Sequence, residues 1–160
     1  MNIKVDDLRH PKVKELLQKH LDDMYATSPK ESVHALDLSG LREANVRFWS
    51  AWQGDELLGC GALKILNSKH GEIKSMRTSE SHNRKGVATN ILQHIIEHGQ
   101  QIGLKQLSLE TGTQDFFKPA RQLYLKNGFQ DCGPFADYSL DPNSLFMTLF
   151  ITKGEFRTRD

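Results

Sequence analysis

A short polar segment, which joins a strand-like run (residues 71–77) to a helical stripe (residues 87–102), has the composition of an anion-binding site. Two small residues, Gly86 and Ala88, would let a ligand approach the backbone closely, and two basic residues stand just before them. The first N–H groups of a helix have no internal partners and lie at the positive end of its dipole. The segment therefore predicts a phosphate or pyrophosphate site formed by Arg84, Lys85, Gly86, Val87 and Ala88. The alternative is a turn and a helix N-terminus that simply face water.

A second motif follows at residues 119–129, PARQLYLKNGF, and together the two segments resemble the signature of the GCN5-related N-acetyltransferase (GNAT) family. The family's Gln/Arg-x-x-Gly-x-Gly/Ala motif is matched at Gly86 and Ala88, whereas Asn83 stands at its first position. The second segment matches the family's A-x-x-L-Y-x-x-x-G-F pattern, but Phe117 stands where the family usually has Asn. The two motifs occur in the family's order and spacing, so together they are more specific than either alone.

The resemblance implies transfer of an acetyl group from acetyl-CoA, used as a cosubstrate, to a primary amine of a small molecule or peptide. The amine would attack the thioester directly. Backbone groups of Met76 and Thr78 would bind the pantetheine arm, and the segment around Gly86 would bind the pyrophosphate. Tyr124 matches the family's tyrosine that donates a proton to the departing thiolate.

Removal of a proton from the amine requires a general base, and the sequence offers two carboxylates on neighbouring strands. Glu72 lies on the central strand and Glu110 at the end of the next strand, and either would act directly or through water. For each of them, a half-exposed surface carboxylate is the alternative interpretation. His34 lies in the region that covers the acceptor in the resembled family, which makes it a candidate substrate-binding residue.

A different class of function also fits the scaffold: a non-catalytic acetyl-CoA-binding sensor or interaction module. The departures at Asn83 and Phe117 keep this alternative open, whereas Tyr124 argues against it, because a binding module does not need a phenol at that position. A nucleoside triphosphate enzyme is excluded, since no Gly-Lys-Ser/Thr sequence follows the glycine.

Composition narrows the range of partners. The 160 residues predict one domain (residues 1–160), and the net charge of +1 gives no basic field for nucleic acid. The absence of a long apolar run and of a signal peptide predicts a cytoplasmic protein that does not bind membranes.

Cys60 lies in an apolar strand pattern, so a buried thiol is expected rather than a disulfide with Cys132. His94 and His98 are four residues apart, but no third ligand is evident, so no metal is expected.

The pattern of elements predicts an α+β fold, α/β in a looser scheme, with a mixed and mostly antiparallel sheet and helices on both faces. A meander precedes a crossover helix, so residues 105–110 should lie parallel to residues 71–77. The resemblance implies that this central pair splays at its C-terminal end. Residues 37–45 are predicted as a loop. For the late strand, residues 145–151, two alternatives are open: pairing across a homodimer, or an edge strand within a monomer.

Overall fold

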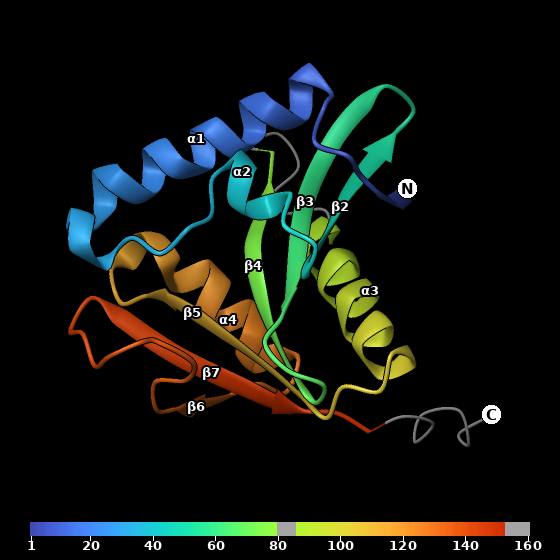
Figure 1. Ribbon diagram of the computed structural model, residues 1–160. Coiled ribbons are helices and arrows are strands. Elements are labelled where there is room, and N and C mark those ends of the chain that lie inside the picture. The colour runs from blue at the N-terminus through green and yellow to red at the C-terminus, as the bar shows by residue number, and fades with distance from the viewer. Residues whose placement is uncertain (80–85, 153–160) are drawn as a thin grey trace.

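The computed structural model describes residues 1–79 and 86–152 and contains a seven-stranded sheet in the order β1-β2-β3-β4-β5-β7-β6 (Figure 1). The strands are β1 (Asn2–Val5), β2 (Val46–Gln53), β3 (Glu56–Ile65), β4 (His70–Thr78), β5 (Gln106–Gly112), β6 (Gln130–Cys132) and β7 (Ser144–Phe150). The α-helices are α1 (Pro11–Thr27), α2 (Leu38–Leu41), α3 (Val87–Gln101) and α4 (Lys118–Lys126). Among the strands that the structure describes, only β4 and β5 pair in parallel, which confirms the predicted mixed, mostly antiparallel α+β architecture.

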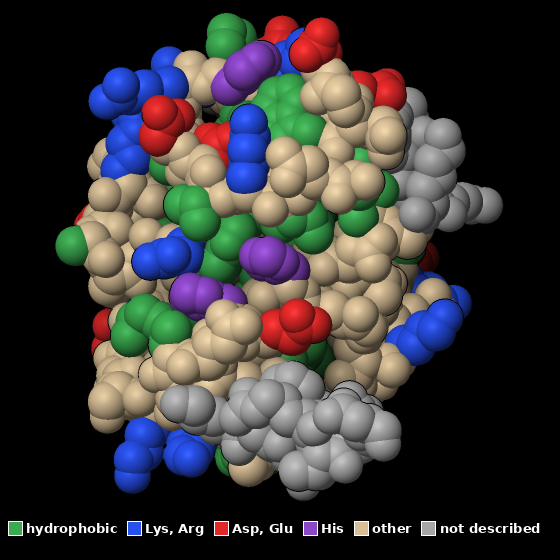
Figure 2. Space-filling model, turned by 90° about the vertical axis from the view of Figure 1, so that its right-hand side faces the viewer, with side chains coloured by type: hydrophobic (Ala, Val, Ile, Leu, Met, Phe, Trp, Pro, Cys, Tyr) green, Lys and Arg blue, Asp and Glu red, His purple; other side chains and the backbone are tan. Residues whose placement is uncertain are grey.

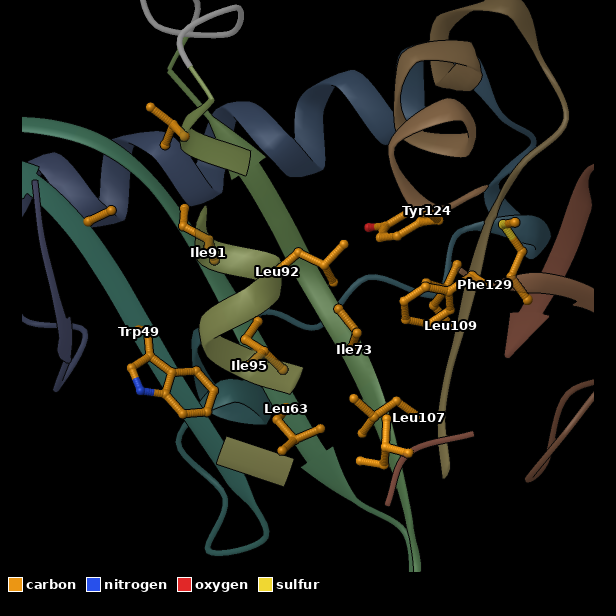
Figure 3. Packing of buried hydrophobic residues seen from close by; sticks show 14 of the residues in the cluster. Trp49, Leu63, Ile73, Ile91, Leu92, Ile95, Leu107, Leu109, Tyr124 and Phe129 are labelled. Atoms are coloured by element: carbon orange, nitrogen blue, oxygen red, sulfur yellow. The ribbon is translucent and has the colours of Figure 1, made fainter. Parts of the chain in front are cut away.

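Helices cover both faces of the sheet, and two hydrophobic clusters hold them there. The larger cluster joins α3 and α4 to one face, and its α3 members are spaced at three and four residues: Val87, Ile91, Leu92 and Ile95 (Figure 3). The second cluster joins α1 and α2 to the other face through Val13, Leu16, Leu17 and Leu41. The sheet is therefore a central layer between two layers of helices.

The helix α3 ends near the predicted end of the helical stripe, whereas the segment at residues 37–45 differs from its prediction. Gly103 has a φ of 88°, in the left-handed region that favours glycine after a helix. The expected loop at residues 37–45 is wrong in part, because it contains the short helix α2. Asp37 caps that helix by accepting a hydrogen bond from the Gly40 N–H at 2.9 Å.

The late strand β7 is an interior strand, so the alternative that it forms a sheet edge within a monomer is wrong, whereas pairing across a homodimer stays a prediction. It pairs antiparallel with β5 along its whole length and with β6 from Phe146 to Thr148. The edge position is taken by β6, a three-residue strand that follows α4.

Cys60 is fully buried and its thiol donates to the Ser75 carbonyl at 3.3 Å. Burial raises the pKa of this thiol to about 12, although the charge of Arg77 acts in the opposite direction. Cys60 and Cys132 are both free, as expected. Within the described ranges, no helix is long and apolar enough to cross a membrane.

His94 and His98 are half-buried residues of α3. On one face of the molecule, Figure 2 shows histidine side chains among hydrophobic ones. Both rings contact the buried Trp49 edge-on, with centroid distances of 5.7 and 5.2 Å. Burial lowers the pKa of His98. Among the residues with described coordinates, no group of three or more potential metal ligands occurs. The helical spacing of this pair thus serves packing against Trp49.

Candidate functional site

The two parallel strands separate in the middle of the sheet. β4 and β5 are in register only from His70 to Glu72 on the first strand, although β4 continues to Thr78 and β5 to Gly112 (Figure 1). Beyond this point the backbone groups of β4 that face β5 have no neighbouring strand to pair with. An extended ligand inserted here would find the backbone donors and acceptors of a strand edge.

A bulge in β4 lies directly at this opening. Cys60 pairs with Arg77 and Ala62 with Lys74, so β4 has one residue more than β3 in this interval. Ser75 adopts a φ of 56°, which is uncommon for a residue with a side chain. Bulges of this kind bend a strand and redirect its backbone groups, so the bulge helps to turn β4 away from β5.

A long cleft opens between α1 and α4, over the far half of β4. We call it the α1–α4 cleft. It has a volume of about 440 Å³ and reaches the start of α3; its lining residues are His20, Asp23, Met24, Met76, Arg77, Thr78, Gly86, Ala88, Thr89, Phe116, Phe117, Pro119, Ala120, Leu123 and Tyr124. An ion pair of 2.5 Å between Asp23 and Arg77 connects α1 to β4 beside this cleft. The predicted cofactor-binding residues Met76, Thr78, Gly86 and Ala88 are thus brought to one cavity.

The N-terminus of α3 ends at this cleft without a side-chain cap. Gly86 is its N-cap residue with a φ of 75°, and a Cβ added there would meet nothing within 4 Å. The first turn of the fifteen-residue helix carries no acidic residue. Since no cap occurs among the described residues, the helix can offer its first N–H groups, which lack intrahelical partners, and its positive dipole end to a ligand in the cleft. Val87 itself is buried in the core, and Arg84, Lys85 and Asn83 lie outside the described residues.

A smaller cavity, the inner chamber, continues the cleft through the gap between β4 and β5. It has a volume of about 100 Å³. Six residues line both spaces: His20, Met24, Met76, Phe117, Ala120 and Tyr124. The chamber has room for a small reacting group, and anything larger must extend from it into a neighbouring cavity.

Tyr124 belongs to this junction and is almost completely buried. Its ring packs edge-on against Phe129 at 5.6 Å, and the hydroxyl lies at the end of the ring directed away from Phe129 (Figure 3). Burial alone raises the pKa of the phenol well above its ordinary value. The hydroxyl thus stays protonated throughout the physiological range and can act as a proton donor.

Beyond the chamber lies an open cavity of about 780 Å³, which we call the vestibule. His34, Glu72 and Lys74 line both the chamber and the vestibule and therefore form the boundary between them. The Lys74 ammonium donates to Glu72 Oε2 at 3.1 Å and to the Tyr138 hydroxyl at 3.0 Å, and Tyr138 donates to the same carboxylate oxygen. The His34 ring contacts Tyr138 edge-on at 5.0 Å. The Glu72 carboxylate thus already has Lys74 as its counter-ion and accepts a hydrogen bond from the Tyr138 phenol.

Glu110 lines the chamber from β5 and is in a different electrostatic state. Burial raises its pKa above the ordinary glutamate value, against smaller lowering effects from the neighbouring Ser144, His34 and Lys74. No salt bridge engages Glu110 within the described part of the chain. A carboxylate with a raised pKa is a better proton acceptor than an ordinary glutamate, so of the two predicted carboxylates Glu110 has the more suitable environment for a base.

Three functional candidates were missed from the sequence alone. Lys74 and Tyr138 reach Glu72 from two and 66 residues away, and the second contact carries no local signal. His20 lies on the buried stripe of α1 with Val13, Leu16 and Leu17, yet it also lines both the cleft and the chamber. A histidine on an otherwise apolar stripe was the one available hint.

Comparisons with known proteins agree with this geometry. A family model described as "Acetyltransferase (GNAT) family" matches residues 13–129. The uncharacterized N-acetyltransferase YsnE of Bacillus subtilis (strain 168) is 60% identical over 148 residues, which cover 92% of this chain and 98% of that protein. The uncharacterized N-acetyltransferase YedL of Escherichia coli (strain K12) is 56% identical over 152 residues, covering 95% and 96%.

Solved structures extend the comparison to the fold. The crystal structure of an aminoglycoside 6'-N-acetyltransferase complexed with coenzyme A has a TM-score of 0.71, covering 94% of this chain and 97% of that one. With 15% sequence identity, this likeness shows the fold.

Proposed function

Because the chain is a member of the acetyltransferase (GNAT) family, we propose that it transfers an acetyl group from acetyl-CoA to a primary amine of a small molecule or peptide. The observation that carries the proposal is the continuous series of three cavities through the gap between β4 and β5. The α1–α4 cleft shares six residues with the inner chamber, and the chamber shares three with the vestibule. Two substrates can therefore enter from opposite ends and meet in the chamber.

The donor would occupy the α1–α4 cleft. The pyrophosphate would lie against the uncapped N-terminus of α3 at Gly86, where the helix dipole and unpaired N–H groups favour an anion. The pantetheine arm would follow the free edge of β4 and exchange hydrogen bonds with the backbone at Met76 and Thr78. Its acetyl end would then reach the junction beside Tyr124.

The acceptor would enter through the vestibule, with its amine in the chamber. The chamber's small volume fits the reacting amine and the acetyl group, so the remainder of the acceptor would lie in the vestibule near His34 and Tyr138. Glu110 would accept the ammonium proton, directly or through water, because burial has already raised its proton affinity. Glu72 would hold Lys74 and Tyr138 in place at the boundary rather than act as the base.

The reaction then balances with the groups at the junction. The deprotonated nitrogen attacks the thioester carbonyl, a C–N bond forms, and the C–S bond breaks. Tyr124 donates its hydroxyl proton to the sulfur and regains one from solvent or from the amine. The products are the N-acetylated amine and free coenzyme A.

The test combines a binding titration with a turnover screen on the intact protein. Calorimetry with acetyl-CoA measures donor binding, and a panel of small primary amines and peptides is screened by release of free thiol and by mass spectrometry of the acetylated product. We expect donor binding and at least one acetylated amine, and we expect Glu110→Gln to bind the donor but to turn over slowly. Donor binding without turnover on any amine would instead support a binding module. Absence of donor binding would refute the assignment of the cleft.

A further inference from the structure

His20 is an unexplained polar group at the junction of the cleft and the chamber. It extends from α1, is 8% exposed, and lines both cavities. Its Nδ1 is enclosed and has no hydrogen-bond partner among the described residues. Leaving a buried polar atom unpaired is unfavourable, and a leucine or methionine would fill the same space on an apolar stripe without that penalty. The position therefore calls for a role beyond packing.

The other groups at the junction leave His20 a specific chemical task. Of the six shared residues, four are apolar (Met24, Met76, Phe117 and Ala120), and only His20 and Tyr124 carry a polar side-chain group. A thioester that reacts here has two polar atoms, the sulfur and the carbonyl oxygen. Tyr124 is suited to the sulfur. The oxygen, on which negative charge develops, can accept hydrogen bonds from the free backbone edge of β4 and from one further donor, for which His20 is the remaining polar side chain among the six.

The environment keeps the His20 imidazole neutral. Burial is the largest effect on its pKa, the positive charge of Arg77 on β4 adds to it, and Asp23 on α1 opposes it, with a resulting pKa of about 4. A neutral imidazole carries one N–H, and a proton on the enclosed Nδ1 would be a buried donor without an acceptor. The favoured tautomer therefore has its proton on Nε2, at the edge of the ring that remains for contact with the cavities.

We propose that His20 is a catalytic residue of the acetyl transfer described above, and that its Nε2–H donates a hydrogen bond to the thioester carbonyl oxygen. The inference rests on the proposed function, because it requires the acetyl group to lie at the junction. No proton leaves the imidazole in this role: the hydrogen bond shortens as charge develops on the oxygen and relaxes when the C–S bond breaks. His20 is also a poor base beside Glu110, since burial disfavours its protonated form.

Three substitutions at one position separate this role from packing. In His20→Gln the side-chain amide can place an N–H near the position of Nε2, in His20→Asn the amide lies near the position of Nδ1, and His20→Leu has no donor. We expect kcat to fall about 10²-fold in His20→Leu and in His20→Asn, as for loss of one oxyanion donor, and to remain within about tenfold of wild type in His20→Gln. The affinity for coenzyme A should stay within about threefold of wild type in all three variants, because coenzyme A lacks the acetyl group to which His20 would donate.

A spectroscopic measurement tests the hydrogen bond without an acceptor. The carbonyl stretch of bound acetyl-CoA, labelled with ¹³C at the carbonyl carbon, should move to lower wavenumber on binding to the wild type and to His20→Gln. In His20→Asn and His20→Leu most of this shift should be lost. If His20→Leu does not fold, the comparison of Gln with Asn still decides.

The outcomes distinguish the inference from the function on which it rests. Acetyl-CoA that fails to bind the wild type would overturn both. Acetyl-CoA that binds with the same carbonyl shift in every variant, or equal kcat in the Gln and Asn variants, would overturn the role of His20 and leave the acetyltransferase proposal intact.

Discussion

Replacing His20 by glutamine should remove a pH dependence of stability that the wild-type protein shows between pH 4 and pH 6.5. The pKa of this imidazole is lowered from 6.5 to about 4 in the folded protein, chiefly by burial. Between these two values the unfolded chain binds a proton that the folded protein rejects, so stability decreases as the pH falls through this window. Above pH 6.5 both states are neutral at this position and the contribution is fully present.

The size of the effect follows from the shift. A difference of 6.5 − 4 = 2.5 pKa units corresponds to about 3 kcal/mol of unfolding free energy lost between pH 7 and pH 4. The steepest part of the curve should have a slope of about 1.4 kcal/mol per pH unit, the value for one proton. Since a small domain has only about 5–15 kcal/mol of stability in total, the loss is readily measured.

Urea denaturation of the wild type and of His20→Gln at a series of pH values provides the assay. Other groups titrate as well, so the informative quantity is the difference between the two curves, which should grow by about 3 kcal/mol from pH 7 to pH 4 in favour of the variant. Lys14→Gln is the matched control, because it places the same residue at an exposed position of the same helix. Parallel curves for wild type and His20→Gln would refute the argument that His20 is buried in its neutral form.

Three further predictions concern the proposed reaction. Tyr124→Phe should lower kcat by about tenfold to a few hundredfold, the lower part of the range for general acid catalysis. Its thermal stability should stay equal or rise, because no hydrogen bond to the hydroxyl occurs among the described residues. An unchanged kcat would assign the proton to another donor. Glu110→Gln should lower the rate about 10²-fold and remove the acidic limb of the pH profile of kcat/KM. In the wild type this limb should lie above the ordinary glutamate pKa, because burial raises the pKa of Glu110. A limb that persists in the variant would exclude Glu110 as the base. Gly86→Val should strongly weaken acetyl-CoA binding in a titration. Gly103→Val is the control: its surroundings are equally open and its φ is 88°, so it should lose similar stability while keeping its affinity for acetyl-CoA. Equal affinities of the two variants for acetyl-CoA would remove the start of α3 from the donor site.

The parts of the site that lie close together in sequence could be predicted from it. Gly86 and the stripe of α3 form one continuous motif, and Tyr124 and Phe129 form another. In both, helical spacing and a local turn determine where each side chain points. The parallel pairing of β4 and β5 also followed, because a crossover helix between two strands leaves little topological choice.

The acceptor side could not be predicted in the same way, because it is assembled by long-range contacts. Tyr138 reaches Glu72 from a loop 66 residues away, and Ser32 donates to Asp141 across 109 residues. Without a period or a motif in either segment, nothing in the sequence indicated that Glu72 would be engaged and Glu110 left without a counter-ion. The same limitation led to the wrong position for β7, since its second partner is a strand of only three residues.

Burial has the same physical effect on Glu110 and on His20, because it disfavours the charged form of each side chain. Burial raises the pKa of the Glu110 carboxyl and so increases its affinity for a proton. It lowers the pKa of the His20 imidazole and so keeps that ring a neutral hydrogen-bond donor. An ammonium that enters a chamber of about 100 Å³ would lose most of its hydration in the same way. Its own pKa should then fall toward that of Glu110, so proton transfer between them becomes less uphill. The environment that makes His20 an inadequate base is thus the one that would allow a carboxylate to deprotonate an amine.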